Sequence, residues 1–101
     1  MNFKKDVENC IRIQGLNETL KICVEEPAEL IKTITKIWRA TNTPNQVKTL
    51  YPNLYKDLLE EMADVFIIIK MLFEIYGITE DEFQEMIESK MQRNIERLKE
   101  V

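Results

Sequence analysis

Hydrophobic residues recur every three to four positions along almost the whole chain, which is the spacing of helices with one apolar side. No segment alternates apolar and polar residues with period two, so the predicted fold class is all-α. The expected architecture is one domain over residues 1–101, an antiparallel helical bundle of about four helices. The pattern predicts these helices over residues 2–13, from about Asn17 to Ala40, from about Asn53 to Tyr76, and from Thr79 to the C-terminus.

Glycine, proline and a capping motif mark where these helices end. Gly15 is expected to stop the first helix and Gly77 the third. The sequence TEDE at 79–82 is typical of a capping box that starts the fourth helix. Pro27 lies inside the second helix and predicts a kink or a fresh start there. Residues 41–53 hold two prolines and several turn formers, so we expect a connection with a short helical turn after Pro44.

The third predicted helix is apolar on almost all sides between Val65 and Tyr76. A helix of that kind is buried on all sides, and a chain of 101 residues can scarcely bury it alone. The sequence therefore predicts that the bundle is completed by oligomerisation, as a homodimer or homotetramer whose interface includes this segment.

The charge balance excludes several classes of partner. A net charge of −4 without a basic block disfavours binding to a nucleic acid polymer or an anionic membrane. Lys4 and Lys5 are not followed by an apolar signal sequence, and the longest apolar run is interrupted by Lys70 and Glu74. These features predict a cytoplasmic protein, in which the two cysteines are free thiols.

The chain has no histidine, which removes histidine acid–base catalysis and the usual zinc sites. The remaining chemistry rests on carboxylates, lysine, arginine or a hard metal ion. Two acid pairs stand out, because one member of each points into the apolar side of a predicted helix and the other lies at its edge. Glu26 and Glu29 form the first pair, Glu61 and Asp64 form the second, and Glu25 and Glu60 fall outside the apolar sides.

Unpaired carboxylates in apolar surroundings are costly, so these acids need a partner. Each pair taken alone is more often a solvated helix face, but two helices repeat the inward pattern. Lys32 and Lys36 lie on the outer side of the second helix and cannot easily reach Glu26. Four carboxylates would form an all-oxygen site suited to Mg²⁺, with Mn²⁺ as the alternative. Their four negative charges favour several ions or a metal-loaded phosphate.

The last helix supplies complementary groups. Asn94 lies in the centre of its apolar side, flanked by Lys90 and Arg97, with Arg93 further out. A core asparagine can be structural, and basic residues near a helix C-terminus are ordinary. Together they form a stripe able to hold phosphate oxygens against a metal site.

In the order of the two acid pairs and the later basic stripe, the chain resembles the all-α nucleoside triphosphate pyrophosphohydrolases of the MazG-like superfamily. This superfamily also contains the dimeric dUTPases and the phosphoribosyl-ATP pyrophosphohydrolases. The similarity lies in a Glu-x-x-Glu motif, a spacer, a Glu-x-x-Asp motif and a late Lys-x-x-x-Asn-x-x-Arg segment. These are Glu26 to Glu29 preceded by Glu25, then Glu61 to Asp64, then Lys90, Asn94 and Arg97.

The resemblance implies Mg²⁺-dependent hydrolysis of a nucleoside triphosphate to the monophosphate and pyrophosphate. Glu26, Glu29, Glu61 and Asp64 would hold the metal, with Glu26 and Glu61 at the catalytic centre. Glu25 would orient or deprotonate the attacking water, or simply be solvated. The substrate-binding residues would be Lys90 and Arg97, which neutralise the phosphates, and Asn94, which bonds a phosphate or sugar oxygen.

Several alternatives stay open at this point. Trp38, Tyr51 and Tyr55 are candidates for stacking on the base, although packing is the better interpretation of Trp38. The preferred nucleotide is open, as is the choice between destroying noncanonical nucleotides and controlling a normal pool. The competing functions are a non-catalytic helical interaction module and a phosphoribosyl-ATP pyrophosphohydrolase.

Overall fold

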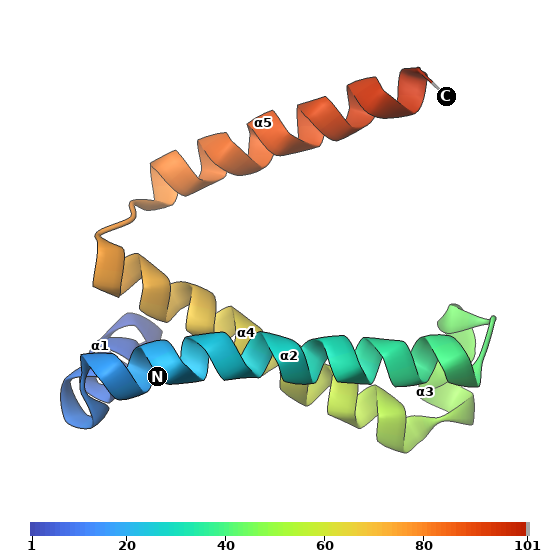
Figure 1. Cartoon of the computed structure of the whole chain (residues 1–101), viewed down its shortest axis with the longest axis horizontal. Helices are drawn as coiled ribbons and strands as arrows, with labels where there is room; N and C mark the ends of the chain where they lie inside the picture. Colours follow the sequence, from blue (N-terminus) through green and yellow to red (C-terminus); the bar gives the residue numbers. More distant parts are fainter. Residues whose placement is uncertain (101) are drawn as a thin grey trace.

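The protein is all-helical in a computed structural model that describes residues 1–100 (Figure 1). No strand forms within these residues, which confirms the predicted fold class, and no helix among them is long and apolar enough to cross a membrane. The expected count of about four helices is wrong, because the segment after Pro44 is helical for longer than one turn. The elements are α1 (Phe3–Gln14), α2 (Leu16–Ala40), the 3-10 helix η1 (Pro44–Gln46), α3 (Val47–Leu50), α4 (Pro52–Tyr76) and α5 (Glu80–Lys99).

The centre of the fold is a hairpin of α2 and α4, two helices of 25 residues each that run antiparallel (Figure 1). They form the most extensive helix–helix contact in the described chain. The short elements η1 and α3 reverse the chain between them. We call α2 and α4 together the hairpin.

The helix α2 continues unbroken through Pro27, so the predicted fresh start there is wrong. Proline lacks an N–H, so the carbonyl of Cys23 loses its usual donor four residues on. The helix α2 begins at Leu16, directly after its N-cap residue Gly15, whose φ of 88° turns the chain out of α1. Thr19 stabilises the turn between α1 and α2, since it is fully buried and its hydroxyl donates to the carbonyl of Gly15 at 2.7 Å.

The hydrophobic core is small and lies mainly where α1 meets the second half of α4. Phe3 of α1 stacks on Phe66 of α4, with ring centroids 5.9 Å apart. A core this small leaves many apolar side chains of the long helices exposed. The buried hydrophobic residues are Val7, Val47, Ile68, Met71 and Phe73.

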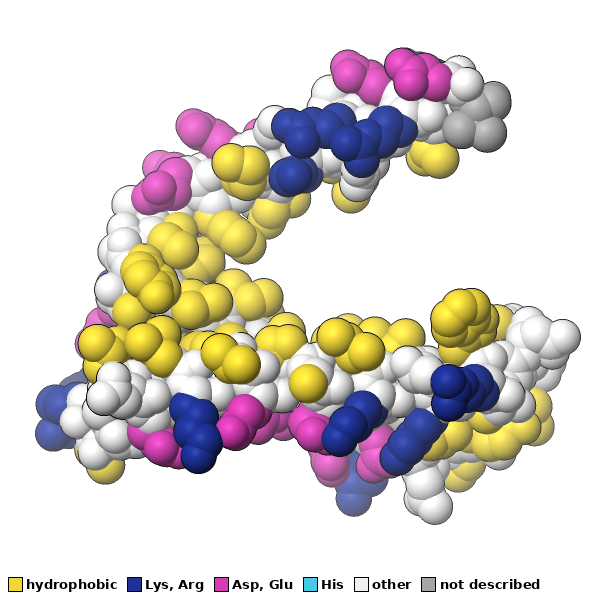
Figure 2. Space-filling model, viewed as in Figure 1, with side chains coloured by type: hydrophobic (Ala, Val, Ile, Leu, Met, Phe, Trp, Pro, Cys, Tyr) yellow, Lys and Arg dark blue, Asp and Glu magenta, His cyan; other side chains and the backbone are white. Residues whose placement is uncertain are grey.

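The helix α5 stands apart from the rest of the chain. The predicted capping box is present, since the Glu82 amide donates to Thr79 Oγ1 at 3.2 Å and the Thr79 amide donates to Glu82 Oε2 at 2.8 Å. Yet no residue of α5 is buried, and it has no extensive contact with another helix. It runs back above the hairpin with an open hollow between them (Figures 1 and 2). In the described chain α5 is therefore held near its start, where Glu80 pairs with Lys70 and the ring of Phe83 contacts Phe73.

Gly77 sets the turn from α4 toward α5 and should be sensitive to substitution. It caps α4 in the left-handed conformation, with φ 65° and ψ 34°, and its amide donates to the carbonyl of Phe73. A Cβ at this position would meet nothing within 4 Å, so a substitution costs backbone strain alone. We expect Gly77→Ala to lower the free energy of unfolding by about 1 kcal/mol. Gly77→Asn is the control and should cost less; equal losses in urea titration would contradict this explanation.

Candidate metal centre

Three carboxylates meet in the middle of the hairpin. Glu26 comes from α2, while Glu61 and Asp64 come from α4, and one oxygen from each lies within 4.8 Å of the others. The antiparallel pairing sets the middle of α2 beside the middle of α4. The spacing of three residues then brings both α4 acids to the same side of that helix. We call these three residues the acid cluster.

Glu29, the fourth predicted ligand, lies at the margin of the acid cluster. It is exposed, and its Oε1 accepts from Lys32 Nζ at 3.4 Å along the outer side of α2. Its charge still acts on the cluster, because it contributes to the raised pKa of both Glu26 and Glu61. The structure therefore brings three predicted ligands together and keeps the fourth nearby.

Electrostatic repulsion within the acid cluster is not relieved by any described lysine or arginine. Burial raises the pKa of Glu26, and the charges of Asp64, Glu61 and Glu29 raise it further. Burial also raises the pKa of Glu61, followed by the charges of Asp64 and Glu29. None of the ion pairs within residues 1–100 includes a member of the cluster. A hydrogen bond with Asp64 also raises the pKa of Glu26, so the cluster could hold either a shared proton or a cation from outside the chain.

One oxygen of the cluster has no partner at all among the described residues. Glu61 Oε2 is shielded from solvent and accepts no hydrogen bond. A buried carboxylate oxygen in that state is costly unless something binds it. An all-oxygen donor set with one unsatisfied oxygen fits a hard divalent cation such as Mg²⁺ or Mn²⁺.

Two further acids beside the cluster face solvent. Glu25 lies 4.0 Å from Lys21 Nζ, and Glu60 lies 3.9 Å from Lys56 Nζ, each in an exposed pair one helical turn apart. Within residues 1–100 no hydrogen bond or ion pair joins Glu25 to the acid cluster, so its role in orienting water stays a prediction. Glu60 provides a matched control position one residue from Glu61.

The predicted phosphate-binding residues lie on α5, away from the acid cluster. Lys90, Asn94 and Arg97 are all exposed. Figure 2 shows acidic and basic side chains together along the edge of the hairpin that points away from α5, and hydrophobic ones along the edge that faces it. Within one chain, therefore, the structure does not bring the basic stripe of α5 to the acids.

The aromatic candidates for base stacking are not gathered at the acid cluster either. Trp38 lies near the end of α2 and is 81% exposed. The Tyr51 hydroxyl donates to the carbonyl of Ala40 at 3.2 Å, and Lys48 lies over the ring of Tyr55. These residues surround the η1–α3 connection, so the described chain does not identify a base pocket.

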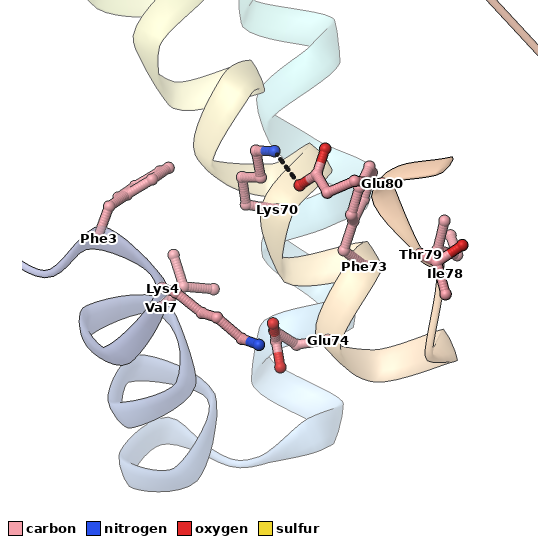
Figure 3. Close-up of a pocket in the computed structure, with 9 residues that line it drawn as sticks. All are labelled: Phe3, Lys4, Val7, Lys70, Phe73, Glu74, Ile78, Thr79 and Glu80. Atoms are coloured by element: carbon pink, nitrogen blue, oxygen red, sulfur yellow. Dashed lines mark hydrogen bonds and ion pairs between the residues drawn. The ribbon is translucent and has the colours of Figure 1, made fainter. Parts of the chain in front are cut away.

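A second feature, at the start of α5, was not predicted from the sequence. A cavity of about 470 Å³ opens between α1, the end of α4 and the start of α5 (Figure 3). Lys70 lies in its wall, with Nζ 2.9 Å from Glu80 Oε1 and 4.7 Å from the centroid of the Phe73 ring. The signal in the sequence was the pair of charged residues, Lys70 and Glu74, that interrupt the apolar run 65–76, and both line this cavity. The ion pair of Lys70 and the edge-to-face contact of Phe73 with Phe83, 4.9 Å between centroids, fix the direction of α5.

Comparison with known proteins found no matching family model, no matching curated protein and no matching solved structure.

Proposed function

We propose that this protein is a Mg²⁺-dependent nucleoside triphosphate pyrophosphohydrolase of the MazG-like superfamily, which converts its substrate to the monophosphate and pyrophosphate. The observation that carries the proposal is the convergence of Glu26, Glu61 and Asp64 around an unsatisfied, solvent-shielded oxygen of Glu61. Three carboxylates without a nearby cation are difficult to explain as a stabilising feature, since they repel one another.

In this proposal Glu26, Glu61 and Asp64 hold the ion directly, and Glu29 adds negative charge at the margin. A bound divalent ion would polarise the phosphates and lower the pKa of a coordinated water. The chain must supply the ligands in ionised form, so binding displaces protons from Glu26 and Glu61, whose pKa values are raised without the ion. Manganese, with the same preference for oxygen ligands, should replace magnesium.

The basic stripe of α5 takes the phosphates. Lys90 and Arg97 neutralise the charge that develops on the leaving pyrophosphate, and Asn94 donates to a phosphate or sugar oxygen. These groups recognise the triphosphate that all nucleoside triphosphates share, so they do not distinguish one base from another. The base preference is therefore measured with a panel of substrates. The same panel tests phosphoribosyl-ATP as the alternative substrate.

The protein acts as a homodimer or homotetramer in this proposal. A single chain leaves Val24, Ile31 and Trp38 of α2 largely exposed, together with Leu59 and Met62 of α4. The same exposed apolar surface favours the second candidate function, a non-catalytic helical module that binds another protein through it. The two candidates differ in whether the acid cluster binds metal and supports turnover.

The test is release of pyrophosphate from a panel of canonical and modified ribo- and deoxyribonucleoside triphosphates, with Mg²⁺ and then with EDTA. We expect release from at least one nucleotide, at least about 10³-fold above the reaction without protein, and its loss in EDTA. Release of orthophosphate in place of pyrophosphate would contradict the bond that we propose is cleaved. No release from any nucleotide, with no thermal shift on adding Mg²⁺ or Mn²⁺, would favour the interaction module.

A further inference from the structure

One ion pair of the described chain differs from the others, because it joins two helices. Lys70 of α4 lies 2.9 Å from Glu80, the first residue of α5. The other ion pairs within residues 1–100 lie inside one helix, between residues three or four positions apart. The Lys70 side chain is also the most buried of the paired lysines, at 26% exposed against 63% or more for the others.

Aromatic rings hold the ammonium of Lys70 in place. It lies over two rings of its own helix, 4.7 Å from the centroid of Phe73 and 5.6 Å from that of Phe66. Phe66 in turn stacks on α1, and Phe73 contacts Phe83 of α5 edge to face. Cation–π contacts stabilise a partly buried ammonium, so these rings favour the position from which Lys70 meets Glu80 (Figure 3).

Close packing does not hold the start of α5. The cavity of about 470 Å³ lies between Thr79 and Glu80 on one side and Val7 of α1 on the other (Figure 3). No residue of α5 is buried, and the Glu80 side chain is 74% exposed. Within residues 1–100, the direction of α5 therefore depends on the turn before it and on its contacts with Lys70 and Phe73.

A small rotation at the start of α5 becomes a large displacement further along the helix. A helix rises about 1.5 Å per residue, so Lys90 lies about 15 Å beyond Glu80 and Arg97 about 25 Å beyond it. A rotation of about 3° at Glu80 would then shift Arg97 by about 1 Å. Misplacing a binding group by about 1 Å can lower a reaction rate by about 100-fold. The contacts at Glu80 thus matter most for the residues near the far end of α5.

The charge of Lys70 needs an explanation, because an apolar side chain would pack equally well between Phe66 and Phe73. Lys70 does not belong to the acid cluster. It lies about 9 Å beyond Asp64 along α4 and is turned by about 120° from it. The charge that Lys70 meets is Glu80, so its effect is exerted on α5.

We propose that Lys70 is a positioning residue, which directs α5, and with it the basic stripe, through its ion pair with Glu80. The residues that it places are Lys90, Asn94 and Arg97. Their contact with substrate phosphates rests on the proposed function, whereas the direction of α5 rests on the contacts of Lys70 alone.

The direction of α5 is measured with two spin labels, which needs no enzymatic activity. The chain carries Cys10→Ser and Cys23→Ser, with labels attached at Lys36→Cys on α2 and at Glu96→Cys on α5. It is diluted in an excess of unlabelled chain, so that the measured distances lie within one chain. Lys70→Met keeps the length of the side chain and removes its charge. We expect it to broaden a narrow distance distribution by at least about 4 Å, the displacement at Glu96 for a rotation of about 10°.

Lys56→Met and Asp81→Asn are the matched controls. Lys56 also lies on α4, but its ion pair with Glu60 stays within that helix. Asp81 follows Glu80 in the first turn of α5 and forms no ion pair within residues 1–100. Both controls should keep the wild-type distribution, whereas Glu80→Gln should reproduce the effect of Lys70→Met. An unchanged distribution in Lys70→Met would show that other contacts hold α5 and would overturn the proposal.

Turnover provides a second measurement once wild-type activity is established. Lys70→Met and Glu80→Gln should each lower kcat/KM by about 10- to 100-fold. Because both break the same contact, the double variant should lose no more than the larger single loss. Lys70→Arg keeps a cation over the rings and should retain most of the activity. A loss in Lys70→Met that Glu80→Gln does not reproduce would mean that Lys70 acts on the substrate itself, which contradicts the proposal.

Stability separates positioning from a general loss of folding. An ion pair with an exposed partner contributes little to stability, so the melting temperature of Lys70→Met should stay within about 4 °C of the wild type. A large fall in melting temperature with an unchanged distance distribution would make Lys70 merely structural. If no nucleotide is hydrolysed while Lys70→Met broadens the distribution, the proposed function fails and the control of α5 by Lys70 stands.

Discussion

Glu61→Gln should reduce kcat/KM for the preferred nucleotide by at least about 10³-fold. Glutamine keeps the size of the side chain and one carbonyl oxygen but removes the negative charge of a central ligand. Since Glu61 Oε2 is the one solvent-shielded oxygen of the cluster without a partner, its loss removes the strongest reason for an ion to bind there. The measurement is steady-state release of pyrophosphate at several Mg²⁺ concentrations, and excess Mg²⁺ should recover only a small part of the loss.

Substitution of the neighbouring acids should give smaller losses of kcat/KM than substitution of Glu61. Glu60→Gln removes the same charge one residue away, but its side chain is exposed beside Lys56, so we expect a change of less than about twofold. Glu29→Gln should fall between, with a loss of about 10- to 100-fold, because Glu29 acts on the cluster from its margin. Equal losses at Glu60 and Glu61 would show that total negative charge matters and that a built metal site does not.

The long helices and the main acid pairs were predictable from sequence because both depend on local periodicity. The predicted start at Asn17 lies one residue from the observed start of α2 at Leu16, since Gly15 interrupts the pattern sharply. The meeting of Glu26 with Glu61 followed from two apolar sides that had to face each other. The helix α3 was not resolved in the sequence, because four residues are too few to show a period.

What the sequence could not predict depends on side-chain rotamers and on contacts between elements. A helical wheel places Glu29 at the edge of the core, but it does not show that the carboxylate turns outward to Lys32. It also identifies the apolar side of α5 without showing what that side faces. The direction of α5 depends on the turn at Gly77 and on the ion pair of Lys70 with Glu80. This ion pair joins residues ten positions apart, so no local sequence pattern predicts it.

The second large effect should be a reversal of the pH dependence of stability when metal is added. Without metal, Glu26 and Glu61 have pKa values raised above their ordinary 4.5 in the folded state. The folded protein then binds more protons than the unfolded chain, so these groups stabilise it below about pH 4.5 and that contribution is lost as pH rises through the raised pKa values. In EDTA the melting temperature should therefore contain a component that falls from mildly acidic to neutral pH.

Divalent metal should change the sign of this component, because an ion binds only the ionised cluster. At 100 times its dissociation constant, Mg²⁺ would add about 2.7 kcal/mol near neutral pH, which corresponds to a rise in melting temperature of about 10–20 °C for a domain of this size. Near pH 5 protons compete for Glu26 and Glu61, so the rise should be smaller. Thermal melts at matched ionic strength, with Ca²⁺ and Mn²⁺ in parallel, measure the effect.

Glu61→Gln separates specific binding from general screening of charge. Removing one of three crowded carboxylates should raise the melting temperature in EDTA at neutral pH by about 2–4 °C and abolish most of the Mg²⁺ shift. Glu60→Gln should leave both the EDTA value and the Mg²⁺ shift close to wild type. A Glu61→Gln protein that Mg²⁺ stabilises as strongly as the wild type would show that the ion binds elsewhere. The acid cluster would then be a source of repulsion that the fold tolerates, and the apolar face of the hairpin would be the main functional surface.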